Sequence, residues 1–282
     1  MGRGEVVGRL RRSTVHVRTE GARNGGAGSG VIWQNDGVIV TNAHVAGNGV
    51  GLSVELWDGR RFPARLKGSD PGKDLAALSI ETDGLPGLPV RESPAKEGET
   101  ALAIGNPLGF TGAMTTGVVK GLGPVRGLGR REWVQTAVQL APGNSGGPLA
   151  DVEGRLLGIN AMVVTGGIAL SVPASVVRNF IRNGPPPRLG IVVREVSVDR
   201  SMRGLLILGV EAGSLAERVS LMIGDVLTRL NGVALEPCDD LTAGLAQPRT
   251  EYARVQFLRG GRSNVRQVSI RLRERPAQEF AA

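Results

Sequence analysis

The chain of 282 residues contains one cysteine, Cys238, which excludes an intramolecular disulfide and leaves folding to the apolar core. It contains no run of about 20 apolar residues, so the sequence predicts no transmembrane segment. The first twelve residues are polar and basic, and they lack the apolar centre of a secretion signal. Aromatic residues make up only 3% of the chain, and they do not interleave with the arginines as they would on a base-stacking surface.

The net charge of +8 comes mostly from arginine. The arginines are scattered, apart from one group at 9–12 and another at 126–131. Such a surface is ordinarily a solvated face, so the charge predicts no specific nucleic-acid partner. The 43 glycines and many short apolar runs predict β-structure joined by tight turns, and the length allows two or three compact units.

The most informative stretch is Gly-Asn-Ser-Gly-Gly-Pro-Leu at residues 143–149. A serine between glycines can stand at a tight turn with its Oγ exposed, while neighbouring backbone N–H groups point at one spot. Acyl transfer requires such a nucleophile and such an oxyanion hole. We therefore predict Ser145 as the nucleophile, with Gly143, Asn144 and Ser145 forming the oxyanion hole. Glycine-rich turns are mostly structural, so the prediction also requires a base and an acid.

The base must come from one of only two histidines. His44 follows an apolar run at 38–41 that is typical of a buried strand, whereas His16 lies in an alternating strand and is expected to face solvent. His44 is the predicted base.

The predicted acid is Asp74, which opens the apolar run at 75–80 and can therefore be partly buried at a strand end. The alternative is Asp70, but an aspartate before a proline commonly starts a turn.

The chain order His44, Asp74, Ser145 is that of the chymotrypsin-type double β-barrel and differs from those of α/β-hydrolases and subtilisins. From about residue 8 onward, the chain also resembles the HtrA/Deg family of trypsin-like serine proteases. The motifs that carry the resemblance are Thr-Asn-Ala-His-Val at 41–45, Asp-Leu-Ala at 74–76, Ala-Ile-Gly-Asn-Pro at 103–107, the stretch at 143–149, Gly-Ile-Asn at 158–160 and Gly-Ile-Ala-Leu-Ser-Val-Pro at 167–173. The resemblance implies peptide-bond hydrolysis by a serine nucleophile, with no metal and no cofactor.

The expected fold is mainly β, a chymotrypsin-like double β-barrel followed by a PDZ domain. The protease domain is expected at 8–183, with His44 and Asp74 on a first barrel at about 8–90 and Ser145 on a second at about 98–173. A site between barrels is a usual place for a substrate cleft.

Within the first barrel, Asn-Asp-Gly at 35–37 and Asp-Gly at 58–59 are hairpin signals, the second leading into a strand at 61–66. A short helix is predicted from Pro173 to Arg182, and Gly-Pro-Pro-Pro at 184–187 then forms a stiff linker.

Residues 188–275 resemble one PDZ domain, a β-sandwich with short helices, with a helix expected to start at Asp240. A PDZ domain adds a peptide to a sheet edge and captures its carboxylate with backbone N–H groups. The expected donors are Leu189, Gly190 and Ile191, with charge from Arg188. The alternative is a small β domain used only for packing or assembly. One departure from the family is Val-Ser-Leu at 219–221, where Ala-Gly-Leu is usual.

The segment ahead of the serine also departs from the family, because residues 136–142 read Thr-Ala-Val-Gln-Leu-Ala-Pro where the family has Thr-Asp-Ala-Ala-Ile-Asn-Pro. The predicted specificity pocket is formed by Gln139, Leu140 and Leu170 and suits a small or medium aliphatic side chain. It holds no carboxylate, so cleavage after Arg or Lys is not expected. Ala137 replaces an aspartate, which removes a polar latch from the family's loop-activation switch.

The sequence thus predicts a serine endopeptidase acting on unfolded or partly unfolded polypeptides, with peptide C-termini bound at the PDZ domain. The alternative is a proteolytically silent chaperone or scaffold working through the PDZ groove. The resemblance implies a homo-oligomer, in the family a trimer held by N-terminal aromatic contacts, but no aromatic residue precedes the first barrel here to make those contacts. The chain as given is expected in the cytoplasm, or in the periplasm or outside the cell if it is trimmed from a longer one.

Overall fold

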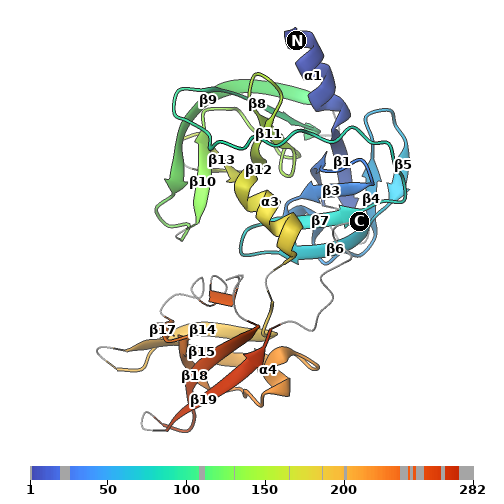
Figure 1. Ribbon diagram of the computed structural model, residues 1–282. Coiled ribbons are helices and arrows are strands. Elements are labelled where there is room, and N and C mark those ends of the chain that lie inside the picture. Colours follow the sequence, from blue (N-terminus) through green and yellow to red (C-terminus); the bar gives the residue numbers. More distant parts are fainter. Residues whose placement is uncertain are drawn as a thin grey trace. The chain divides into compact units, whose positions relative to one another are not determined.

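The computed structural model describes residues 2–19, 26–107, 112–129, 131–164, 166–185, 187–199, 202–235, 241, 244–245, 251–261 and 264–272. The chain divides into two compact units, Met1–Gly184 and Pro185–Ala282 (Figure 1). The division falls within the predicted linker, of which Pro186 lies outside the described residues.

The first unit opens with a helix that the sequence analysis missed, α1 (Arg3–Arg12), so this unit begins before the expected boundary at residue 8. An antiparallel sheet follows, in the order β5-β4-β1-β2-β3-β7-β6. Its strands are β1 (Thr14–Thr19), β2 (Ala27–Ile32), β3 (Val38–Thr41), β4 (Leu52–Glu55), β5 (Arg61–Pro63), β6 (Arg65–Asp70) and β7 (Leu75–Ser79), with the short helix α2 (Ala43–Ala46) after β3.

Both predicted hairpins are present in this sheet, since β2 pairs with β3 and β4 pairs with β5. The strand expected at 61–66 is instead split at Ala64, because β5 bonds to β4 whereas β6 bonds to β7. Within the described residues the end strands β5 and β6 do not pair with each other, so the first barrel is barrel-like and open rather than closed.

A closed barrel forms the rest of the first unit, in the order β10-β13-β12-β11-β8-β9. Its strands are β8 (Thr100–Gly105), β9 (Ala113–Pro124), β10 (Glu132–Thr136), β11 (Pro148–Ala150), β12 (Leu156–Val164) and β13 (Ile168–Pro173). The predicted helix is α3 (Ala174–Asn183), which begins after Pro173 and buries Val177, Phe180 and Ile181. Figure 1 shows α3 leading directly out of the barrel.

One apolar cluster holds the two sheets of this unit together. It contains Val40 and Leu75 from the first sheet and Ile104 and Leu156 from the second. Leu10 of α1 enters the same cluster, fully buried. Burying each leucine contributes roughly 1.5–3 kcal/mol. The shared cluster therefore stabilises one arrangement of the two sheets, and with it the positions of the loops that they carry.

The second unit has a sheet in the order β14-β15-β16-β18-β19, with β17 paired to β16. Its elements are β14 (Ile191–Ser197), β15 (Arg203–Val210), α4 (Leu215–Arg218), β16 (Val226–Leu230), β17 (Val233–Ala234), β18 (Tyr252–Leu258) and β19 (Val265–Arg271). A sheet with short helices agrees with the expected PDZ class. Asp240, where a helix is predicted to start, lies outside the described residues.

Across the described residues, no helix is long and apolar enough to cross a membrane.

Candidate active site

His44 and Asp74 lie beside each other at the ends of two neighbouring strands of the first sheet. His44 lies on α2 just after β3, and Asp74 directly precedes β7, the strand that pairs with β3. Both carboxylate oxygens of Asp74 lie 2.9 Å from the His44 Nδ1, and the His44 backbone N–H donates to Oδ1 at 3.1 Å. The imidazole is therefore fixed by a side-chain and a backbone contact to the same carboxylate, with Nε2 left for another partner.

The turn that presents Asp74 is strained and braced. Asp74 has a φ of 54°, a left-handed conformation that a non-glycine residue rarely adopts. Its backbone carbonyl accepts a hydrogen bond from the Asn42 Nδ2 at 2.9 Å. Asp70 lies at the start of this turn, where its carboxylate binds both the backbone N–H and the Nζ of Lys73. That is the arrangement of a turn-starting aspartate, and it places Asp70 with Lys73 instead of with His44.

The pKa values of the two histidines are shifted in opposite directions. The hydrogen bond to Asp74 raises the pKa of His44 above its ordinary 6.5, against the desolvation that accompanies its partial burial. For His16, burial on β1 is the largest effect and lowers the pKa, with the neighbouring Arg18 acting in the same direction. Glu55 raises the pKa of His16, but burial and Arg18 outweigh it, whereas the hydrogen bond to Asp74 is the largest effect on His44 and stabilises its imidazolium.

Ser145 lies on the loop between β10 and β11. Its backbone carbonyl accepts a hydrogen bond from the Ser29 N–H of β2 at 2.8 Å, which ties this loop of the closed barrel to the first sheet. The hydroxyl donates to the carbonyl of Ala161 at 2.9 Å. To exchange a proton with His44, the hydroxyl must leave that carbonyl and turn its Oγ toward the imidazole.

The backbone around Ser145 presents two N–H groups. Gly143 has a φ of 100°, which only glycine adopts easily. In the part of the chain that the structure describes, neither the Gly143 N–H nor the Ser145 N–H has a hydrogen-bond partner. The Asn144 N–H donates to the carbonyl of Ala141 at 3.0 Å. Asn144 therefore closes the turn and supplies no oxyanion donor, which corrects its predicted role.

The three predicted pocket residues have different environments. Gln139 is exposed, and Leu140 is half-buried against the core of the closed barrel. Leu170 is fully buried in the apolar cluster shared by the two sheets. Its side chain packs in the core instead of lining an open surface, because β13 directs it inward between β10 and β12. Of the three, only Gln139 and Leu140 have exposed surface.

In the second unit, the expected carboxylate-binding segment precedes the edge strand β14. The carbonyls of Leu189 and Gly190 accept hydrogen bonds from Ala216 and Glu211, at 2.9 and 2.8 Å. Gly190 has a φ of 70°, and a Cβ there would lie 2.3 Å from the Cβ of Ser214, so the position requires glycine. Arg188 is exposed. Ile191 begins β14 and pairs with Val210.

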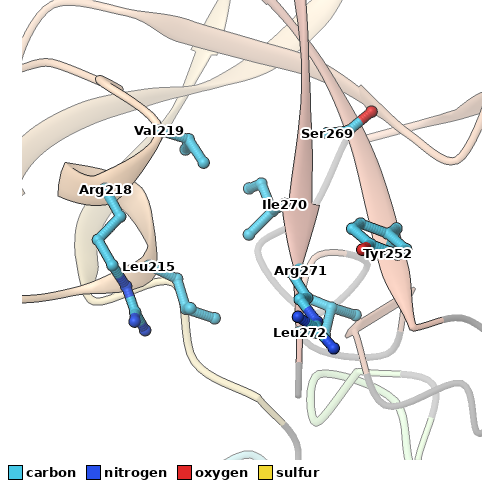
Figure 2. A pocket seen from close by; sticks show the side chains of 8 residues that line it. All are labelled: Leu215, Arg218, Val219, Tyr252, Ser269, Ile270, Arg271 and Leu272. Atoms are coloured by element: carbon cyan, nitrogen blue, oxygen red, sulfur yellow. The ribbon is translucent and has the colours of Figure 1, made fainter. Parts of the chain in front are cut away.

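A pocket in this unit lies elsewhere, between α4 and the opposite edge strand β19 (Figure 2). Its volume is about 380 Å³. Figure 2 shows Leu215 and Val219 on the side of α4, facing Ile270 on β19. None of the predicted carboxylate-binding residues lines it. Arg271, at its rim, is paired with Glu251 at 2.8 Å.

Two residues that contact the site were missed by the sequence analysis. Asn42 holds the backbone of Asp74, and Ser29 holds the loop of Ser145. Asn42 lies within the motif at 41–45, so its position beside His44 was a usable signal. Ser29 lies far from Ser145 in the sequence, and only the folded structure brings β2 to the Ser145 loop.

Comparison with known proteins agrees with this geometry. A family model described as a trypsin-like peptidase domain matches residues 28–159. A probable periplasmic serine endoprotease, DegP-like, from Hahella chejuensis is 39% identical over 73% of this chain and 48% of its own length. A putative serine protease, HhoA, from Synechocystis sp. is 32% identical over 85% of this chain and 69% of its own. The chain thus spans about half the length of the DegP-like relative.

Among solved structures, the HtrA-type protease AlgW with a tripeptide is 28% identical and matches with a TM-score of 0.63, covering 99% of each chain. The likeness therefore extends over both units. The order of the site residues, the paired sheets that carry them and these relatives together place the chain in the HtrA/Deg family of trypsin-like serine proteases.

Proposed function

We propose that this chain is a serine endopeptidase that hydrolyses peptide bonds of unfolded or partly unfolded polypeptides. The observation that carries the proposal is the carboxylate of Asp74 against the His44 Nδ1 at 2.9 Å, on the sheet to which the Ser145 loop is tied. A histidine oriented in this way is the general base that such a nucleophile requires. Membership of a protease family gives the reaction its class.

In the proposed mechanism, Ser145 Oγ attacks the scissile carbonyl as His44 Nε2 takes its proton. Asp74 holds the Nδ1–H tautomer and stabilises the imidazolium. The Gly143 and Ser145 N–H groups bind the oxyanion, and His44 then protonates the leaving amine. A water molecule then attacks the acyl-enzyme carbonyl while His44 again takes the proton, and the Ser145 hydroxyl is regenerated as the new C-terminus leaves. Every step uses side chains and backbone of the chain, so the proposal includes no metal and no cofactor.

We further propose that the second unit binds the C-termini of peptides. Support comes from the Leu189 and Gly190 carbonyls, which are tied back to the unit, so that the N–H groups of the same segment can face a carboxylate. In the described residues, neither of those N–H groups has a backbone partner. AlgW, which matches both units, was solved with a bound peptide.

A silent chaperone or scaffold is the second candidate, and one observation favours it. The Ser145 hydroxyl donates to Ala161 and not to the base. A protein held permanently in that arrangement would bind polypeptides without cleaving them.

The decisive experiment is labelling with a fluorophosphonate probe, followed by digestion of an unfolded protein such as reduced casein. We expect labelling and cleavage by the full chain, and neither by Ser145→Ala. Binding of casein without labelling would reject the endopeptidase and support the scaffold. The oligomeric state and the cellular location stay predictions, which sedimentation analysis and fractionation of the source cells would test.

A further inference from the structure

Ser29 is a buried polar residue that the proposed mechanism does not use. It lies on β2, in the Gly-Ser-Gly stretch at 28–30, and is completely buried. A buried hydroxyl is normally present because it satisfies particular hydrogen-bonding groups. The partners of Ser29 indicate which groups these are.

The hydroxyl of Ser29 joins two loops of the closed barrel. It accepts a hydrogen bond from the Asn106 N–H at 2.8 Å and donates one to the Gly143 carbonyl at 2.7 Å. A serine hydroxyl has a single proton. Because the Asn106 N–H can only donate, that proton is directed to Gly143.

The partner loop is itself braced. The Asn106 Oδ1 accepts a hydrogen bond from the Gly112 N–H at 2.8 Å, and Asn106 is buried. The backbone at Asn106 and Pro107 also approaches Gly143 closely, since a Cβ on Gly143 would lie 2.7 Å from the Asn106 carbonyl oxygen. Ser29 therefore acts on Gly143 from a fixed position.

The backbone of Ser29 holds the other side of the same loop. Its N–H donates to the Ser145 carbonyl at 2.8 Å. One residue thus binds the carbonyls of Gly143 and Ser145, the two residues whose N–H groups form the proposed oxyanion hole. The approach is tight, because a Cβ on Gly146 would lie 2.0 Å from the Ser29 carbonyl oxygen.

We propose that Ser29 is a positioning residue for the oxyanion hole. By fixing the Gly143 and Ser145 carbonyls, it orients the backbone of the turn so that the two N–H groups point at one oxygen. This inference rests on the proposed endopeptidase function. Ser29 touches no substrate, and its effect passes through Gly143 and Ser145.

The test compares Ser29→Ala and Ser29→Cys with a matched control, Thr14→Val. Thr14 is also buried, and its hydroxyl also donates to a backbone carbonyl at 2.7 Å, that of Leu10, which belongs to α1 and not to the serine loop. The control therefore loses a comparable hydrogen bond. Ser29→Cys keeps the side-chain volume nearly unchanged and replaces the hydroxyl with a weak donor, which protects the experiment against a failure of Ser29→Ala to fold.

Activity is measured per active site, by titrating each variant to completion with the fluorophosphonate. We expect kcat of Ser29→Ala to fall by about tenfold, the factor that one ordinary hydrogen bond represents, while KM changes little. A peptide boronate, whose tetrahedral adduct places an oxygen in the hole, should lose affinity by a similar factor. Ser29→Cys should lie between wild type and Ser29→Ala, and Thr14→Val should keep the wild-type kcat despite a lowered Tm.

The proposal is overturned if Ser29→Ala or Ser29→Cys keeps the wild-type kcat per titrated site and the wild-type boronate affinity. It is equally overturned if Thr14→Val loses kcat as much as Ser29→Ala, since the hydroxyl would then act only through stability. Failure of the proposed function gives a different result, a wild-type chain that is neither labelled nor active.

Discussion

The choice of Asp74 over Asp70 can be decided by comparing two alanine variants. Asp74→Ala removes both contacts to the His44 Nδ1 and the contact to its backbone N–H. Asp70→Ala removes only the ion pair and the backbone hydrogen bond to Lys73. The two aspartates lie on one turn, so the comparison separates a catalytic role from a structural one.

The expected losses differ in kind. Without Asp74, the tautomer and orientation of His44 are no longer fixed, and kcat should fall by about 10⁴-fold, the magnitude known for an uncoupled triad aspartate. Without Asp70, a buried hydrogen-bonded carboxylate is lost, and the free energy of unfolding should fall by about 1–3 kcal/mol. Activity per titrated site should stay within a few-fold, because Asp70 does not contact His44.

The pH dependence supplies a second measurement. In the wild type, Asp74 raises the pKa of His44 above 6.5, so kcat/KM should increase with pH through an inflection above that value. In Asp74→Asn, residual activity should show the inflection shifted to lower pH. The same linkage affects stability. The contribution of the His44–Asp74 pair is fully present below the unfolded-state pKa and is lost as the pH rises through the higher folded-state pKa.

The assay is hydrolysis of a fluorogenic peptide across pH 5–9, about the range in which a histidine changes charge, with thermal unfolding of each variant measured in parallel. Equal loss of kcat in Asp70→Ala and Asp74→Ala would refute the assignment of the acid. An unshifted inflection in Asp74→Asn would refute the stated cause of the pKa change.

Three further predictions concern specificity, the second unit and its turn. A peptide library should show cleavage after Val, Ala, Ile or Leu, because the segment 136–142 carries no carboxylate; dominance of Arg would contradict this. A peptide with a free apolar C-terminus should bind in the micromolar range, about −6 to −8 kcal/mol, and calorimetry should show most of this lost on amidation; equal affinities would exclude carboxylate capture by Leu189 and Gly190. Ser220→Gly should raise the free energy of unfolding by about 0.5–1 kcal/mol, because Ser220 has a φ of 57°; unchanged chemical denaturation would contradict it.

The sequence alone determined the features that depend on local pattern. The glycines around Ser145, the turn dipeptides of the hairpins and the apolar face of α3 each act over a few residues, so their consequences can be predicted without the fold. The preference for Asp74 also came from local context, since an aspartate before a proline starts a turn and one before an apolar strand can be buried.

The helix α1 shows where prediction from the local sequence pattern fails. Its segment is polar, basic and glycine-containing, and the sequence analysis predicted no helix there. Val6 and Leu10 of this helix are buried, and they pack in the cluster shared by both sheets. Tertiary packing supplied the stabilisation that helix propensity did not, because a short helix gains most of its stability from one apolar face.

The tertiary structure alone decided the contacts between residues distant in the sequence. Ser29 and Gly143 are joined by a hydrogen bond because β2 of one sheet meets a loop of the other. Leu170 was expected at a pocket and lies in the core, since the register of β13 determines which face a side chain takes. Asn144 was expected to donate to an oxyanion and closes a turn instead. Spacing along the chain identifies the residues of a site, whereas their orientation follows from how the sheets pack.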